Sequence, residues 1–448
     1  MKDLTKGKPK KLLLEFALPV FLANICQLFY SLVDSRIVGQ TLGDNSLAAI
    51  YATNSVSSLI VGFLLGLASG FAILVARYFG ANDEKELRRS TAGAILLGVI
   101  TALILTILSV TFLRPLLHVL NTPDTVMGEA YDYIRIILLG MVITMAYNVL
   151  AGILRAIGDT MAPLFFLIIS TILNIFLDYF FIINLNMGVK GAAQATIICQ
   201  AVSVILCIVY IWRKYPMLHL KREDFRMDLN LVEKLYSTGI SMGFMLSIVY
   251  LGTLALQGAI NTFSDETIVA HGAARKITEI FMLSFSVFGT TMATYASQNY
   301  GAGEIKRIKE GVRTVTIYTW IWSLGAMIAS YTIAPQLVRL VTATENQEII
   351  QTATLYLRID TLFYFVPALI TIIRNTMQGI GDHTTPIYSS LIELIGKVLI
   401  AFLLAPKIKY MGIILAEPIV WILMVIPLIV KYLSNPVMKS EKLLQYGK

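Results

Sequence analysis

Charged side chains are scarce in this sequence, and their scarcity narrows the class of protein. Asp, Glu, Lys and Arg make up 14% of the 448 residues, whereas 56% are hydrophobic. A typical soluble domain has about 25% charged residues, and the mean hydropathy here is +0.73. The composition therefore predicts an integral membrane protein and excludes an ordinary soluble domain.

Cysteine and histidine are also few, which argues against a disulfide framework or a metal centre. The three cysteines, Cys26, Cys199 and Cys207, all lie in apolar runs, and an odd number gives no disulfide pattern. The four histidines are scattered and have no metal-ligand spacing. Because no set of residues for a nucleophile or a metal is visible, we expect neither an enzyme nor a cofactor.

The net charge of +8 does not indicate nucleic acid, because the basic residues lie between apolar runs rather than on one polar surface. With the N-terminus placed in the cytoplasm, the inner loops and tails, counted with the adjoining ends of the runs, hold 24 Lys and Arg, and the outer loops, counted in the same way, hold six. Cytoplasmic loops of membrane proteins are enriched in these residues. Both termini are therefore predicted to be cytoplasmic.

Twelve apolar runs are long enough to cross a bilayer, which takes about 20 residues. They lie near residues 12–38, 46–76, 90–113, 129–152, 161–186, 189–212, 232–260, 267–295, 312–334, 351–374, 386–406 and 411–434. The first run follows a basic start but lacks a signal-peptide cleavage site, so we interpret it as a retained span. The predicted fold is an all-α membrane protein with twelve transmembrane helices.

Loop motifs recur in the two halves of the chain. SQNYGAGEIKRIKE at 297 repeats ARYFGANDEKELRR at 76 with an offset of 221 residues, and QGIGDHTTP at 378 repeats RAIGDTMAP at 155 with an offset of 223. A weaker echo relates GIILAE at 412 to GAAQAT at 191. The repeats predict two pseudo-symmetric six-helix bundles in parallel orientation, because six spans are an even number.

The predicted bundles are residues 1–212 and 232–448, joined by a cytoplasmic loop at 213–231. Within the first bundle, Gly62, Gly66 and Gly70 recur every fourth residue. This spacing is typical of a groove that packs against another helix.

Asp178 is the one charged residue between 161 and 186. A carboxylate in hydrocarbon costs at least a few kcal/mol, so an acid in a membrane span indicates a functional site. Asn174 lies one helical turn earlier on the same face. The alternative is that Asp178 lies near the helix end and its carboxylate reaches water.

Asp34 lies in the first run, four residues after Tyr30, so that the phenol can donate to the carboxylate on one helix face. The alternatives are that Asp34 caps the outer helix end or pairs with Arg36. At a rise of about 1.5 Å per residue, Asp34, Asp178 and Thr196 all lie roughly 9–13 Å inside the outer boundary. They can form one site if their three spans are neighbours.

Two carboxylates, an amide and a hydroxyl supply the oxygen ligands that a hard monovalent cation takes. Asp34, Asn174, Asp178 and Thr196 are therefore predicted to bind Na+ if the protein uses it, with Tyr30 beside them. Two close carboxylates cannot both stay ionised, so the same group can hold a proton. Competition between proton and cation for one place is what an ion-driven transporter requires.

The second half lacks these paired acids, because Leu256 and Ala401 stand at the repeat positions of Asp34 and Asp178. Its apolar runs contain other charges: Arg275, Lys276, Glu279, Asp360, Glu393, Lys397 and Glu417. Asp360 is expected to pair with Arg275 or Lys276, since a lone charge at that depth is costly. These three are a possible secondary site. Glu393 and Lys397 are four residues apart and are expected to neutralise each other, with a structural role left equally open.

These motifs, in their order and spacing, resemble the multidrug and toxic compound extrusion family. The motifs are ALP at 17–19, YxxxD at 30–34, the loop at 78–81, LRAIGDT at 154–160, NxxxD at 174–178, GAAxAT at 191–196 and LAEP at 415–418. The chain looks most like the branch related to DNA-damage-inducible DinF proteins. In that branch, the resemblance assigns Asp34, Asn174, Asp178 and Thr196 to the cation and proton site of the N-terminal bundle.

The resemblance implies an antiporter that exports cationic or amphiphilic organic compounds in exchange for H+ or Na+. It further implies a monomer in the lipid of a bacterial inner membrane. One departure is that the other bacterial branch has a carboxylate midway along the seventh span, where this chain has only uncharged side chains between Lys234 and Asp265. The alternatives are a lipid-linked precursor flippase of the same superfamily, which would need a basic central cavity, and an exporter of a metabolite other than a drug.

Overall fold

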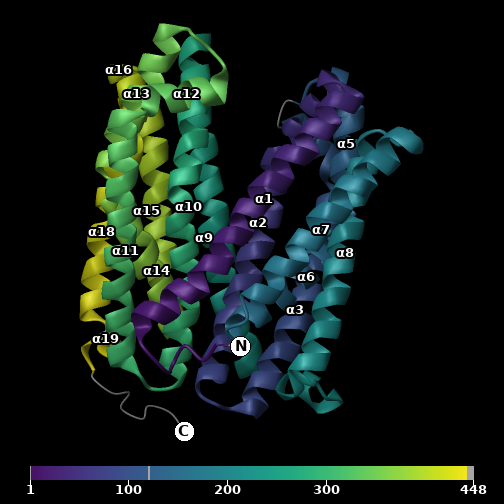
Figure 1. The fold of residues 1–448 in the computed structure, drawn as a ribbon, viewed down its shortest axis with the longest axis vertical. Helices are drawn as coiled ribbons and strands as arrows, with labels where there is room; N and C mark the ends of the chain where they lie inside the picture. The colour runs from purple at the N-terminus through teal and green to yellow at the C-terminus, as the bar shows by residue number, and fades with distance from the viewer. Residues whose placement is uncertain (1, 120–121, 441–448) are drawn as a thin grey trace. The chain divides into compact units, whose positions relative to one another are not determined.

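Helices carry nearly all of the described chain, which comprises residues 2–119 and 122–440 of a computed structural model (Figure 1). In this part of the chain, nine helices are long and apolar enough to cross a membrane, or up to 12 if each of three bent helix pairs is one span. The predicted all-α membrane fold with twelve spans is confirmed.

In the described residues of its first half, the chain forms eight α-helices. They are α1 (Pro9–Leu42), α2 (Asp44–Gly80), α3 (Glu84–Thr111), α4 (Leu113–Val119), α5 (Asp124–Leu139), α6 (Met141–Ala156), α7 (Met161–Tyr179) and α8 (Val189–Lys214). A π-helical turn, η1 (Phe180–Asn184), continues α7, and two 3₁₀ turns, η2 (Pro216–Leu218) and η3 (Arg222–Phe225), follow α8.

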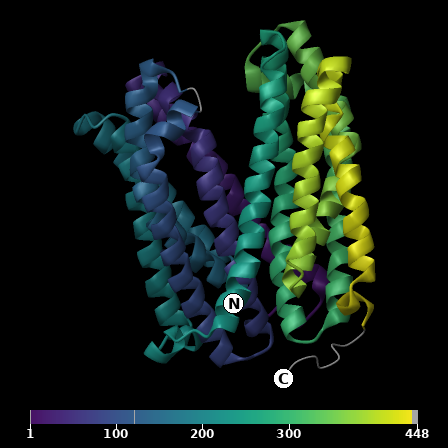
Figure 2. The ribbon, with the colours of Figure 1, turned by 180° about the vertical axis from the view of Figure 1, so that it is seen from behind.

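The second half begins with α9 (Leu229–Ile260). It continues with α10 (Asp265–Gly301), α11 (Ile305–Thr332), α12 (Ala334–Thr342), α13 (Gln347–Leu362), α14 (Phe365–Ile380), α15 (Thr384–Leu399), the π-helical turn η4 (Ile400–Leu404), α16 (Ala405–Ile408), α17 (Tyr410–Ile414), α18 (Ala416–Ser434) and α19 (Pro436–Lys439). Helices α15 and α18 run side by side, as the yellow-green and yellow ribbons of Figure 2 show.

Corresponding helices of the two halves have corresponding ends. Helix α2 spans 44–80 and α10 spans 265–301, so both ends are 221 residues apart. The pair α5 and α6 is bent by 47°, and the pair α13 and α14 by 53°. Both α7 and α15 pass directly into a π-helical turn. The repeat therefore extends from the loop motifs to the irregularities inside the helices.

The contacts divide the chain into two compact units. The first contains Leu18–Gly243, and the second contains Leu4–Ala17 together with the residues from Phe244 onward. By this division α1 and α9 each contribute to both units, since each contains one of the boundaries. The bundle limits that the sequence suggests, 1–212 and 232–448, remain predictions.

The repeated GD motif turns the chain from one helix into the next. Gly158 and Gly381 have φ of 80° and 97°, in the left-handed region that favours glycine. The following aspartates begin the next helix. Asp159 accepts a hydrogen bond from the Ala162 amide at 3.1 Å, and Asp382 accepts from the Thr385 amide at 3.0 Å. Both carboxylates thus satisfy amides at the start of a helix, as capping residues do.

Gly66 and Gly70 let α2 approach α9 within the first unit. A Cβ atom on Gly66 would lie 2.5 Å from the Met242 carbonyl oxygen, and one on Gly70 would lie 2.5 Å from the Gly239 Cα. Both neighbours are backbone atoms that cannot rotate away. The packing role predicted for this glycine spacing is confirmed at these two positions.

We expect Gly70→Ala to lower the free energy of unfolding by about 1–3 kcal/mol, because the added methyl group forces two helix backbones apart. In a thermal unfolding experiment on purified protein this is a fall in Tm of roughly 3–10 °C. Gly258→Ala is the matched control, since a Cβ atom there meets nothing within 4 Å. Equal Tm values for the two variants would contradict the close crossing.

Asp159 also holds the end of α8 against this turn. Its Oδ2 accepts from Tyr210 at 2.8 Å and from Tyr215, and Lys214 lies 3.4 Å away. Burial would raise the pKa of Asp159, but the hydrogen bonds from Tyr215 and Tyr210, the Ala162 amide and the Lys214 charge outweigh it. The pKa of this loop carboxyl is therefore held below its ordinary value.

The folded-state pKa of Asp159 is lower than the ordinary aspartate pKa of 3.8, so the ionised carboxylate stabilises the fold at pH values above 3.8. This contribution is lost as the pH falls through the lower, folded pKa. We expect Asp159→Asn to destabilise the protein by about 1–2 kcal/mol at pH 7 and less at pH 3. Unfolding midpoints of both proteins from pH 3 to 7 measure this, and a pH-independent difference would refute it.

Candidate functional site

Three spans of the first unit bring the predicted site residues together. Helix α1 carries Tyr30 and Asp34, α7 carries Asn174 and Asp178, and α8 carries Thr196. The carboxyl groups of Asp34 and Asp178 lie close enough to act on each other electrostatically. Two carboxyls this close need a shared proton or an intervening cation, because two bare anions would repel.

Tyr30 and Thr196 join α1 to α8 beside the acids. The Tyr30 hydroxyl lies 3.0 Å from Thr196 Oγ1. Thr196 Oγ1 in turn donates a hydrogen bond to the Ala192 carbonyl oxygen at 3.1 Å. Since Thr196 has one proton and directs it to Ala192, Tyr30 is the donor to Thr196. The bond expected from Tyr30 to Asp34 is thus replaced by one across two helices, although the Asp34 charge remains close to the phenol.

The buried oxygens of this cluster lack protein donors. Asp178 is 0% exposed and Asn174 is 1% exposed. Both oxygens of Asp178, both polar atoms of the Asn174 amide and Oδ1 of Asp34 have no hydrogen-bond partner among the described residues. A buried polar atom without a partner costs about 1–3 kcal/mol, and a charged one costs more. Such a set fits a small cation or a proton as its partner, and the oxygens are the ligands such a cation takes.

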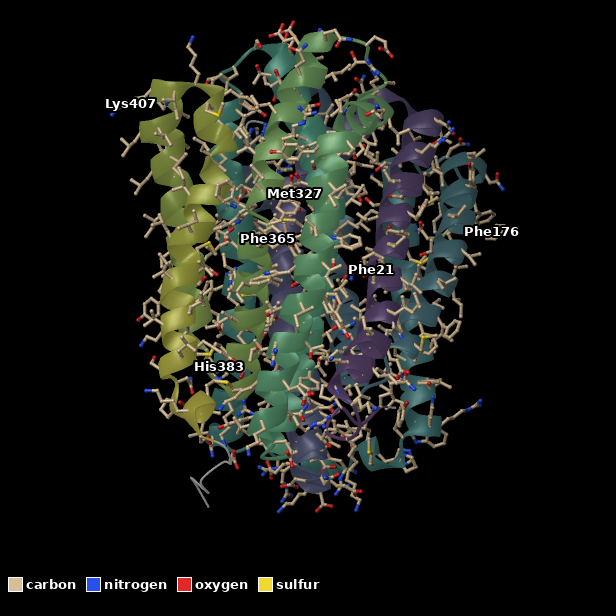
Figure 3. The ribbon with its side chains drawn as sticks, turned by 60° about the vertical axis from the view of Figure 1, so that its left-hand side comes forward. Phe21, Phe176, Met327, Phe365, His383 and Lys407 are labelled. Atoms are coloured by element: carbon tan, nitrogen blue, oxygen red, sulfur yellow. The ribbon has the colours of Figure 1, made fainter. Side chains whose placement is uncertain are left out.

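The alternatives considered for the two acids do not hold. Asp178 is fully buried, so its carboxylate does not reach water at a helix end. Asp34 faces Asp178, and Arg36 is exposed, with no ion pair to Asp34 in the described part of the chain. The exposed side of α7 consists mostly of large apolar side chains, and Figure 3 shows one of them, Phe176, pointing away from the neighbouring helices.

Two further residues belong to this cluster and were missed in the sequence. Tyr133 on α5 lies within electrostatic range of both Asp34 and Asp178, and Cys199 on α8 lies within range of Asp178. Cys199 follows Thr196 by three residues, so helical spacing could have placed it on the same face. No comparable spacing links Tyr133 to the acids, because it comes from a separate helix.

The second unit contains a buried network of charges. Lys397 Nζ on α15 lies 3.0 Å from Glu393 Oε1 and 3.1 Å from Glu417 Oε1 on α18. Arg275 on α10 lies 3.5 Å from Glu417, and Arg374 on α14 lies 3.7 Å from Glu393. The pairing of Glu393 with Lys397 is confirmed, and the ion-pair network around it includes residues from three more helices.

The pairing expected for Asp360 needs correction. Arg275 is ion-paired with Glu417 instead, and Lys276 is exposed on α10. Within the described residues, Asp360 has no ion pair within 4.0 Å and its oxygens have no hydrogen-bond donor, although the charge of Arg275 acts on it. An equal depth along two spans does not fix the direction in which a side chain points. Asp360 thus borders the network without joining it.

The family model of MatE matches the chain twice, at residues 19–180 and at residues 241–403. Together the two matches cover well over half of the 448 residues. The chain belongs to the MatE family. The matched segments start at 19 and 241, so one family model fits each repeat of this MatE protein separately.

Relatives extend over nearly the whole MatE chain. YoeA of Bacillus subtilis, a probable multidrug resistance protein, is 26% identical over 413 residues, which are 90% of this chain and 89% of that protein. A FAD transporter of Shewanella oneidensis is 24% identical and covers 92% of both chains. A solved MOP superfamily transporter from Pyrococcus furiosus matches with a TM-score of 0.89 at 22% identity over 98% of both chains. This last likeness shows a shared fold.

Proposed function

We propose that this MatE protein is a secondary antiporter that exports small organic cations or amphiphiles in exchange for H+ or Na+. The observation that carries the proposal is the contact between Asp34 and Asp178, two acids from different spans with no paired cationic side chain among the described residues. The relative YoeA is named a probable multidrug resistance protein, which supports small organic compounds as substrates.

The two acids couple ion binding to helix packing. With a proton or Na+ bound, the carboxyls of α1 and α7 attract the same positive charge and hold the two helices together. Without it, two anions in a medium of low dielectric repel. Ion loading therefore changes the preferred packing of the first unit, which is the differential interaction that alternating access needs. Asn174, Thr196 and Tyr30 tune the site without changing its charge.

The second candidate is export of a metabolite rather than a drug. The FAD transporter among the relatives supports it, since that protein covers 92% of this chain. A flippase for lipid-linked pyrophosphates is less well supported, because the buried cations Arg275, Arg374 and Lys397 are neutralised by glutamates. Uptake of a fluorescent organic cation and of FAD into inverted vesicles, compared under H+ and Na+ gradients, separates the two candidates.

We expect Asp34→Asn and Asp178→Asn each to abolish gradient-driven export, because the amide keeps the shape of the carboxyl but cannot titrate. Thr196→Ala removes one hydrogen bond worth about 1 kcal/mol, so it should weaken ion affinity only about fivefold. Dye uptake into inverted vesicles under imposed H+ and Na+ gradients measures the export rate of each variant and its dependence on each ion.

The matched control for these variants is Asp132→Asn, which loses a half-exposed carboxylate paired with Lys190 at 3.1 Å. Its transport should equal that of the unmodified protein. If Asp34→Asn or Asp178→Asn exports at that same rate with unchanged pH and Na+ dependence, the coupling site lies elsewhere.

We also propose that the protein is a monomer in the cell membrane. From the distribution of Lys and Arg, we propose that both termini and residues 213–231 lie in the cytoplasm. Single cysteines placed by Asp265→Cys and Arg222→Cys, in a chain whose native cysteines are replaced, test the orientation. Both positions are exposed, so their labelling by an impermeant maleimide depends on the side of the membrane. In intact cells residue 265 should react and residue 222 should not; the reverse pattern would invert the topology.

A further inference from the structure

The polar cluster of the first unit and the charged network of the second lie at the same positions of the repeat. Asn174 follows the first residue of α7 by 13 residues, and Lys397 follows the first residue of α15 by 13. Thr196 comes seven residues after Val189, the first residue of α8, and Glu417 comes seven residues after Tyr410, the first residue of α17, whose span continues through α18 to Ser434.

A third position follows the same rule. Tyr133 and Tyr356 are each nine residues from the first residue of α5 and α13. Tyr133 lies within range of the two acids of the first cluster, and Tyr356 lies within range of Arg275, Asp360 and Glu417. Three independent helix pairs therefore place the two clusters at equivalent positions of the two units.

What differs between the clusters is the source of positive charge. In the first unit, Asp34 and Asp178 face each other, and no described lysine or arginine forms an ion pair with either of them. In the second, the Lys397 ammonium lies between Glu393 and Glu417 at 3.0 and 3.1 Å, and its side chain is 3% exposed. The two glutamates come from different helices, so the ammonium joins α15 to α18 as a bound cation would.

We propose that the Lys397 ammonium is a tethered cation that permanently fills, in the second unit, the site which repeats the cation site of the first. The second unit then binds no exchangeable cation at this position, and ion coupling is confined to Asp34 and Asp178. The comparison with an exchangeable cation rests on the proposed function; the filled site in the second unit does not.

A pair whose only role is to stiffen one helix would look different. Neighbouring charges four apart on a helix stabilise it by a few tenths of a kcal/mol and need no third group. Here Lys397 also contacts Glu417 on another helix, and each glutamate has an arginine nearby, Arg275 at 3.5 Å from Glu417 and Arg374 at 3.7 Å from Glu393. Taking Lys397 away leaves a buried position between two carboxylates that still attracts a cation.

This property gives a direct test by chemical rescue. Lys397→Ala removes Cγ, Cδ, Cε and Nζ, and n-propylammonium has the same three carbons and nitrogen. We expect the variant, purified as the full chain, to lose roughly 10 °C in Tm. Added n-propylammonium should restore at least half of that loss, whereas propan-1-ol and tetramethylammonium at equal concentration should restore none.

Lys407→Ala is the matched control, because Lys407 is exposed on α16 and points away from the helices (Figure 3). Neither it nor the unmodified protein should respond to n-propylammonium. Where Lys397→Ala does not accumulate, Lys397→Ser is used, with the same rescue expected. Lys397→Met fills the space without charge and should show no rescue.

Three results would overturn the proposal: no rescue in folded Lys397→Ala or Lys397→Ser, equal rescue by propan-1-ol, or equal stabilisation of Lys407→Ala. The rescue is repeated in an Asp34→Asn, Asp178→Asn background, where it should persist. Because its readout is stability and not export, failure of the proposed coupling role for Asp34 and Asp178 would leave the rescue unchanged. The two ideas therefore fail separately.

Discussion

The cost of a charge in hydrocarbon governs the arrangement of this protein, because a buried acid is stable only if it is neutralised by a proton or paired with a positive charge. The two units meet this requirement in opposite ways. Asp34 and Asp178 lie close together with no cationic side chain paired to them among the described residues, and we propose that a small ion or a proton fills that role. Glu393 and Glu417 share an ammonium that the chain itself supplies. One constraint thus produces a responsive cluster in one repeat and a self-contained one in the other.

The surrounding helices are arranged so that these side chains meet. The GD turns start α7 and α15 at fixed points, since Asp159 and Asp382 bind the first amides of those helices. A fixed start determines the face on which the residue 13 positions later lies, which is Asn174 in one helix and Lys397 in the other. The loop motif that reveals the repeat in the sequence is therefore also the device that sets the position of each cluster.

The sequence predicted the spans, the repeat and most of the first cluster, because each depends on local features such as apolar length, loop motifs and helical spacing. It could not predict contacts that depend on how helices are rotated about their axes. Asp360 and Arg275 lie within electrostatic range, but Arg275 pairs with Glu417. Tyr133 was missed for the same reason, and the bends after α5 and α13 lie within runs whose hydropathy is continuous.

The π-helical turn after α15 has a consequence for which face of this span is exposed to lipid. A π turn holds one more residue than an α turn, so every side chain beyond it is rotated by about 100° relative to a straight α-helix. In the α15 span, residues before Ile400 and after Leu404 therefore belong to two different angular registers, because α16 continues the span to Ile408. Apolar substitutions tolerated on one face of the span before the turn will therefore be tolerated on a different face after it. A single helical wheel cannot describe both parts of the span.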